Sequence, residues 1–184
     1  EKGPGIELFW RVKECLGEKE VLAEDLGYVT DSVRQLVRDT GYPGMKVLEF
    51  AFDSRDTGSA NDYLPHNYPE NSVVYTGTHD NETLTGWFEG ILPQERQMVR
   101  NYLNNHRDSD KEIYWDMVCT AMQSVSKLCV IPIQDYLGYG NEARMNQPST
   151  LGENWKWRLK KGELSEELIQ KIKNITMWYG RYYG

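Results

Sequence analysis

The chain has 184 residues, of which 39% are hydrophobic, and 21 Lys and Arg against 28 Asp and Glu give a formal net charge of −7. This length suffices for one domain with its own core. The acidic balance argues against nucleic-acid or anionic-membrane partners, because both need clustered cations. No apolar run approaches the roughly 20 residues of a membrane span, and no secretory signal pattern is visible. We therefore expect a cytoplasmic protein.

The cysteine count argues against a disulfide or zinc framework. Cys15, Cys119 and Cys129 are an odd number and form no C-x-x-C pair, whereas such frameworks use paired spacings. Aromatic residues are abundant, with 6 Trp and 12 Tyr. Sugar-binding clefts use such rings as platforms, but ordinary interfaces also contain them, so the composition is a weak indication of a carbohydrate site.

The first part of the chain alternates helix and strand patterns. Apolar residues such as Leu8 and Val12 recur at helical spacing. Thr30 is suited to cap a helix, which Gly41 would end. We expect, in chain order, a helix ending before Gly17, a strand over residues 20–23, a helix over 31–39 and a strand over 46–52.

The second part begins with a polar segment, residues 53–72, which is too long for a hairpin and is therefore a candidate binding loop. Ser109 and Glu112 fit a capping box, and Ser165 is suited to cap the last helix. The expected elements are a strand over residues 73–76, helices over 94–104 and 111–126, a strand over 128–133 and a helix over 166–179.

This alternation indicates parallel β/α units and an α/β fold. Four strands can be counted, whereas a closed (β/α)8 TIM barrel needs eight strands and about 250 residues. The sequence therefore predicts about half of such a barrel.

Acidic residues accompany each predicted strand. Three of the four predicted strands are followed closely by an acid: Glu24 with Asp25, Asp80, and Asp135. The remaining strand, over residues 46–52, contains Glu49. In β/α barrels the catalytic groups project from the carboxyl ends of several strands. Carboxylates that converge there without His or Cys metal ligands suit acid–base chemistry on glycosidic bonds. The alternative is that each acid caps the following helix or pairs with an arginine.

Seven sequence blocks carry a resemblance to a known family. They are residues 22–27 (LAEDLG), 44–52 (GMKVLEFAF), 63–68 (YLPHNY), 75–81 (YTGTHDN), 134–135 (QD), 142–146 (EARMN) and 154–158 (NWKWR). These blocks resemble the amylomaltase family of 4-alpha-glucanotransferases, glycoside hydrolase family 77. They occur in the family's order and span nearly the whole chain.

The resemblance implies roles for individual residues. Glu24 matches the family's general acid/base, and Asp80 matches the carboxylate that stabilises the distorted sugar and its oxocarbenium-like transition state. His79 matches a histidine that binds hydroxyls of the donor sugar. Phe50 resembles an aromatic residue on the acceptor side, and Asn146 resembles a residue that contacts the glucan.

Other residues of these blocks keep two interpretations. Asp25 is a structural partner of Glu24 or a second acid, and His66 is a loop histidine or a sugar ligand. Trp155 and Trp157 are two residues apart, so on a strand they would share a face. They form either a sugar platform or part of the packing.

The resemblance also implies a residue that the chain does not contain. The family's nucleophilic aspartate lies in an Arg-x-Asp-His segment at the end of the fourth strand, and no such segment occurs here. A retaining transferase needs that carboxylate to hold the glycosyl group covalently. We therefore expect residues 1–184 to be a single fragment, the C-terminal half of the barrel with strands five to eight, and to be inactive alone.

The implied partners are maltooligosaccharides or starch-derived glucans, and no metal or organic cofactor is implied. The alternative is a folded, non-catalytic fragment with residual glucan binding. Because a half-barrel leaves two open sheet edges and an exposed inner face, a homodimer of half-barrels is a further hypothesis.

Overall fold

A computed structural model of the chain describes residues 3–27, 29–55 and 61–182, so residues 56–60 of the polar segment lie outside the described part. The helices and strands are α1 (Ile6–Leu16), α2 (Asp31–Thr40), β1 (Gly44–Val47), β2 (Ser72–Tyr75), α3 (Leu84–Gly90), α4 (Pro93–Tyr102), α5 (Ile113–Met122), β3 (Leu128–Val130), α6 (Ile133–Leu137) and α7 (Glu166–Trp178). Within the described residues, no helix is long and apolar enough to cross a membrane.

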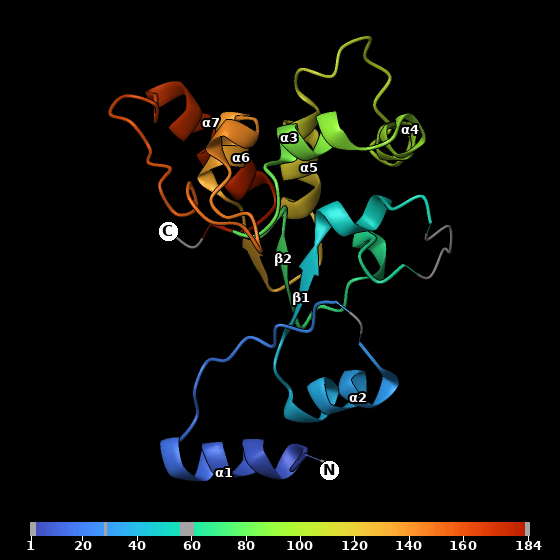
Figure 1. Ribbon diagram of the computed structural model, residues 1–184, viewed down its shortest axis with the longest axis vertical. Helices are drawn as coiled ribbons and strands as arrows, with labels where there is room; N and C mark the ends of the chain where they lie inside the picture. Colours follow the sequence, from blue (N-terminus) through green and yellow to red (C-terminus); the bar gives the residue numbers. More distant parts are fainter. Residues whose placement is uncertain (1–2, 28, 56–60, 183–184) are drawn as a thin grey trace.

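A parallel sheet in the order β1-β2-β3 lies at the centre of the molecule (Figure 1). Gly44 pairs with Ser72, and Val73 pairs with Leu128. Parallel neighbours need long crossover connections, and α3, α4 and α5 lie in the crossover from β2 to β3. The predicted α/β class with parallel strands is confirmed.

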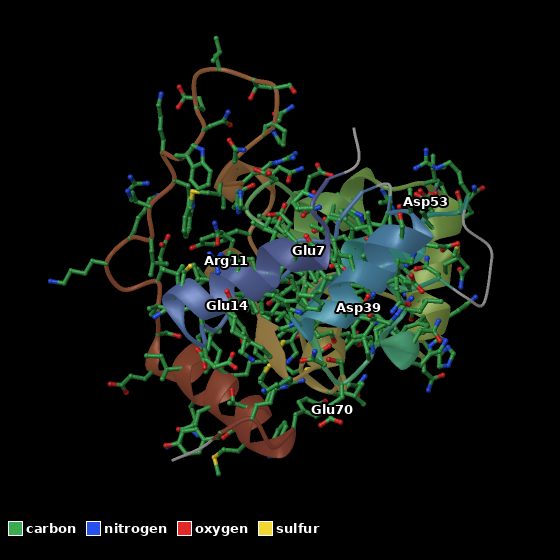
Figure 2. The ribbon with its side chains drawn as sticks, turned by 90° about the horizontal axis from the view of Figure 1, so that it is seen from below. Glu7, Arg11, Glu14, Asp39, Asp53 and Glu70 are labelled. Atoms are coloured by element: carbon green, nitrogen blue, oxygen red, sulfur yellow. The ribbon has the colours of Figure 1, made fainter. Side chains whose placement is uncertain are left out.

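The two ends of the sheet carry different groups of helices. The helices α1 and α2 pack against each other at the end where the strands begin, and α3, α5, α6 and α7 gather toward the end where the strands finish (Figure 1). Figure 2 looks along the sheet from the α1 end, where Arg11 and Glu14 form an exposed ion pair of 2.6 Å on α1.

Helices cover only one face of the sheet. Val74 belongs to the core together with Met117 of α5, which is fully buried, and Cys129 packs against this core. Side chains alternate between the two faces along a strand, so Leu128 and Val130 point to the opposite face, where they are 47% and 36% exposed. This second face, here called the open face, is open at β3, whereas Val47 and Val73 on the same face are buried.

The predicted strand over residues 20–23 is not formed. Only Ala23 pairs with Gly44, as an isolated parallel bridge. The neighbouring Met45 N–H donates to the Asp25 carboxylate at 2.7 Å, so this donor is not available to extend the pairing. Among the described residues the sheet has three strands rather than the four expected.

Two other strands are shorter than the sequence predicts. β1 ends at Val47, and Leu48–Phe52 form a 3₁₀ turn because apolar side chains at helical spacing are buried there. β3 ends at Val130, and Pro132, which has no N–H to donate to a neighbouring strand, precedes the short helix α6.

The predicted helices are confirmed more closely, although their ends differ. Thr30 and Ser165 cap α2 and α7, and their hydroxyl oxygens accept backbone N–H groups at 3.4 and 3.1 Å. The predicted capping box is wrong: Ser109 accepts the Lys111 N–H at 3.3 Å, and Glu112 precedes α5 without a side-chain cap.

The sequence does not predict α3, because two glycines interrupt its helical pattern. Thr83 starts it by accepting the Gly86 N–H at 3.2 Å. A Cβ atom at Gly86 would lie 2.3 Å from Oδ1 of Asn141. Glycine is therefore needed here for close contact with a distant segment, which no local pattern reveals.

Candidate active site

β2 leads directly into a turn that carries His79 and Asp80. Within this turn Oδ1 of Asn81 accepts the Thr78 N–H at 2.9 Å and the Thr78 hydroxyl at 2.7 Å, and the same hydroxyl oxygen accepts the Asp80 N–H at 3.3 Å. Short polar side chains thus hold the backbone, and the side chains of His79 and Asp80 remain exposed.

Two candidate catalytic carboxylates share one pocket. Glu24, His79 and Asp80 line a pocket of about 460 Å³ together with Tyr75 and Val130. Burial raises the pKa of Tyr75, and the charge of Glu24 raises it further. The structure therefore brings together residues that are 56 positions apart, on the open face of the sheet and near the carboxyl ends of its strands.

A loop that follows α6 contacts Asp80 and leaves it exposed. Nδ2 of Asn146 donates to Oδ1 of Asp80 at 2.6 Å, and the Asn146 N–H donates to the His79 carbonyl at 3.0 Å. The guanidinium of Arg144 donates to the backbone carbonyls of Asp80 (2.7 Å) and Asn146 (2.9 Å). Arg144 belongs to one of the recognised blocks, but its role depends on a contact across 64 positions that sequence reasoning missed.

Trp155 lies against the site and Trp157 does not. The ring centroids of Trp155 and His79 are 5.1 Å apart, and 53% of Trp155 is exposed. Trp155 has φ of 65°, and its N–H donates to the Met145 carbonyl at 2.7 Å. Trp157 contacts Tyr139 instead, so the two tryptophans do not form a shared platform on a strand.

Phe50 lies outside the pocket of Glu24 and Asp80. It lines a different pocket, of about 440 Å³, with Tyr63 and Trp87 among its neighbours. The rings of Phe50 and Tyr63 meet edge to face with centroids 5.3 Å apart. Of the five residues proposed from the sequence, the structure brings four together and leaves this one apart.

Two residues with open interpretations have structural partners. The Asp25 carboxylate accepts the Met45 N–H. His66 stacks on Tyr102, and its Nδ1 lies 3.1 Å from the tyrosine hydroxyl oxygen. These contacts favour the structural interpretation of both residues.

The remaining strand-end acids, Glu49 and Asp135, are buried, with 4% and 2% exposure. Burial raises the pKa of Asp135 to about 6, although hydrogen bonds from Thr76 and Leu84 oppose the rise. Burial, followed by the charges of Asp135 and Glu82, raises the pKa of Glu49 well above its usual value. No cluster of three or more His, Cys, Asp or Glu in the described ranges could hold a metal ion.

Comparison with known proteins supplies a family. A family model described as 4-alpha-glucanotransferase matches residues 1–165. A Clostridium butyricum 4-alpha-glucanotransferase is 44% identical over 182 residues, which cover 98% of this chain and 36% of the relative. The Thermus thermophilus enzyme is 47% identical over 171 residues, 90% of this chain and 34% of the relative.

A structural relative agrees with these matches. A structure described as amylomaltase from Streptococcus agalactiae in complex with acarbose superposes with a TM-score of 0.91 and 38% identity, over 100% of this chain and 36% of that protein. The chain thus spans about a third of the length of the relatives it matches. A potato relative, 41% identical over 97% of this chain and 31% of its own length, is named chloroplastic/amyloplastic, so the cytoplasmic location stays a prediction. The chain belongs to the 4-alpha-glucanotransferase family.

Proposed function

We propose that this chain provides the acid/base and donor-binding part of a 4-alpha-glucanotransferase, which transfers α-1,4-glucan segments between maltooligosaccharides. The observation that carries the proposal is the pocket that Glu24, His79 and Asp80 line together. The acarbose complex of the Streptococcus agalactiae relative supports a glucan-like ligand.

The proposed reaction is a retaining double displacement. Glu24 protonates the leaving O4 oxygen and then, as a carboxylate, removes the proton of the acceptor hydroxyl. Asp80, oriented by its hydrogen bond from Asn146, stabilises positive charge on the donor sugar in the transition state. His79 and Asn146 bind the donor glucan, and Phe50 contacts the acceptor.

The covalent step needs a further carboxylate as nucleophile. The 184 residues contain no Arg-x-Asp-His segment, and we propose that a residue outside this chain supplies it. The consecutive parallel order β1-β2-β3, with the bridge at Ala23 beside β1, supports residues 1–184 as one fragment, the C-terminal half of a (β/α)8 barrel.

This division of the site predicts that the chain alone is inactive. Incubation with maltotriose should yield neither glucose nor maltooligosaccharides longer than maltotriose, because the carboxylate proposed to hold the glycosyl group lies outside this chain. The appearance of those products would contradict the proposed division.

A hybrid enzyme tests the roles of Glu24 and Asp80 directly. In the Thermus thermophilus relative, the matching region is replaced by this chain, and transfer from maltotriose is measured. We expect an active hybrid, with kcat lowered about 1,000-fold or more by Glu24→Gln and by Asp80→Asn, since each removes a group that acts on the transition state. Glu20→Gln, an exposed residue four positions before Glu24, is the matched control and should leave kcat unchanged. Normal activity of E24Q would refute the assignment.

A further inference from the structure

Glu49 is buried beneath the turn that carries Asp80, and the proposed reaction does not use it. Its N–H donates to the Thr76 carbonyl at 3.3 Å at the end of β2. Its Oε1 lies close to Gly77, the residue after Thr76, since a Cβ atom at Gly77 would be only 2.8 Å from this oxygen. The side chain of Glu49 therefore touches Gly77, the residue directly before the Thr78–Asn81 turn.

Asn81 connects Glu49 with Asp80. Both side chains meet at Gly77, where a Cβ atom would lie 2.8 Å from Oε1 of Glu49 and 3.2 Å from Cβ of Asn81. Against the larger effect of burial, which raises the pKa of Glu49, a hydrogen bond from the Asn81 side chain lowers it. Oδ1 of Asn81 accepts both the N–H and the hydroxyl of Thr78, whose hydroxyl oxygen accepts the Asp80 N–H. A continuous set of contacts thus leads from the buried carboxyl to the backbone of the proposed catalytic residue.

We propose that Glu49 is a positioning residue: its buried carboxyl group, acting through Asn81, fixes the Thr78–Asn81 turn and with it the orientation of His79 and Asp80. This inference rests on the proposed function, because Asp80 is the reacting group that it positions. Glu49 does not itself line the pocket of Glu24 and Asp80, but it contacts Gly77, which does.

The surroundings of Glu49 determine its protonation. Asp135 of α6 and Glu82 after the turn face it with negative charge, and Arg144 is the opposing positive charge. Its Oε1 has no hydrogen-bond partner within the described residues, which a neutral acid tolerates better than a carboxylate. Burial and these negative charges therefore raise the pKa of Glu49 well above its usual value, and we expect its ionisation to disturb the turn.

Carboxyl ¹³C NMR of the 184-residue chain gives the first test. We expect one glutamate resonance, identified by its loss in Glu49→Gln, to titrate well above the usual range of a glutamate carboxyl. The resonance of the exposed Glu70, at the periphery in Figure 2, should be unchanged in this variant. The imidazole signals of His79 should shift in the same high pH range, and this shift should be absent in E49Q. Titration of Glu49 in the usual range of a glutamate, or a His79 signal that does not follow the titration of Glu49, would overturn the inference.

Kinetics of the hybrid enzyme separate positioning from a purely structural role. Glu49→Gln keeps the shape of the neutral acid and cannot ionise, so the hybrid should lose any decline of kcat that follows the titration of Glu49 in the NMR experiment. Glu49→Ala should lower kcat about 100-fold with a smaller change in KM. Glu70→Gln is the matched control and should change neither. The same kcat–pH profile in E49Q as in the parent hybrid, or full activity of E49A, would contradict the proposal.

The two proposals fail in different ways. An inactive hybrid with the unmodified chain would argue against the proposed function, while the NMR titrations would still decide whether Glu49 controls the turn. An active hybrid with an ordinary Glu49 titration would leave the proposed function intact and refute the positioning role.

Discussion

At the scale of single residues, Asp135 shows how burial and hydrogen bonding compete. Its carboxylate accepts the Thr76 hydroxyl at 2.5 Å and the Leu84 N–H at 2.8 Å, so it ties the end of β2 to the start of α3. Its pKa is nevertheless raised from 3.8 to about 6, because burial is the larger effect. A raised pKa in the folded state means that the stability contributed by this group is lost as pH rises between these two values.

Asp135→Asn should therefore change the pH dependence of stability. The variant cannot titrate, whereas the unmodified chain loses up to about 3 kcal/mol of unfolding free energy as pH rises from about 4 to about 6. We expect the variant to have a lower free energy of unfolding than the unmodified chain at pH about 4. This difference should become smaller toward pH 7. Urea denaturation at both pH values measures this, and a gap independent of pH would contradict the assignment.

At the scale of elements, the structure confirms one of two similar serine caps that the sequence suggests and not the other. Ser165 accepts the Leu168 N–H at 3.1 Å at the start of α7, and Ile175 of this helix is buried in the core. Ser109 has a similar pattern in the sequence, but it bonds only to Lys111 before α5 begins.

Ser165→Ala should lower the free energy of unfolding by about 1 kcal/mol, the typical cost of losing an N-cap. Ser109→Ala is the matched control, and its effect should be smaller because Ser109 caps no helix. Urea denaturation of both variants tests this order. Equal losses of unfolding free energy in the two variants, or a larger loss for S109A, would contradict the conclusion that Ser165 caps a helix and Ser109 does not.

At the scale of the whole molecule, the open face of the sheet is the feature that a partner could cover. Leu128 and Val130 of β3 are exposed there, and exposed apolar strands at a sheet edge favour pairing with another chain. We expect the isolated chain to form homodimers as its concentration rises.

Val130→Lys should weaken this association, because it places a charge on the open face. Val125→Lys is the control: Val125 is 60% exposed but lies outside the sheet, so its replacement should leave association unchanged. Sedimentation velocity over a range of concentrations measures both, and a monomer at every concentration would contradict the dimer.

Local patterns in the sequence predict much of the helical structure. The caps of α2 and α7 depend on residues three positions apart, and such short-range contacts are visible in any sequence. The strands are predicted less well. β1 ends where Leu48 turns into the core. The segment at Ala23 does not extend its pairing with β1, because the Asp25 side chain accepts the Met45 N–H.

By itself, the sequence determined the family, the α/β class and the candidates Glu24, His79, Asp80 and Asn146, since these depend on recognisable blocks and on periodicity. Only the tertiary structure decided which acids are exposed and which are buried. Glu24 and Asp80 open into one pocket, while Glu49 and Asp135, which also accompany strands, lie in the interior. The physical reason is that burial and protonation depend on contacts such as that of Thr76 with Asp135, across 59 positions, which no local pattern contains.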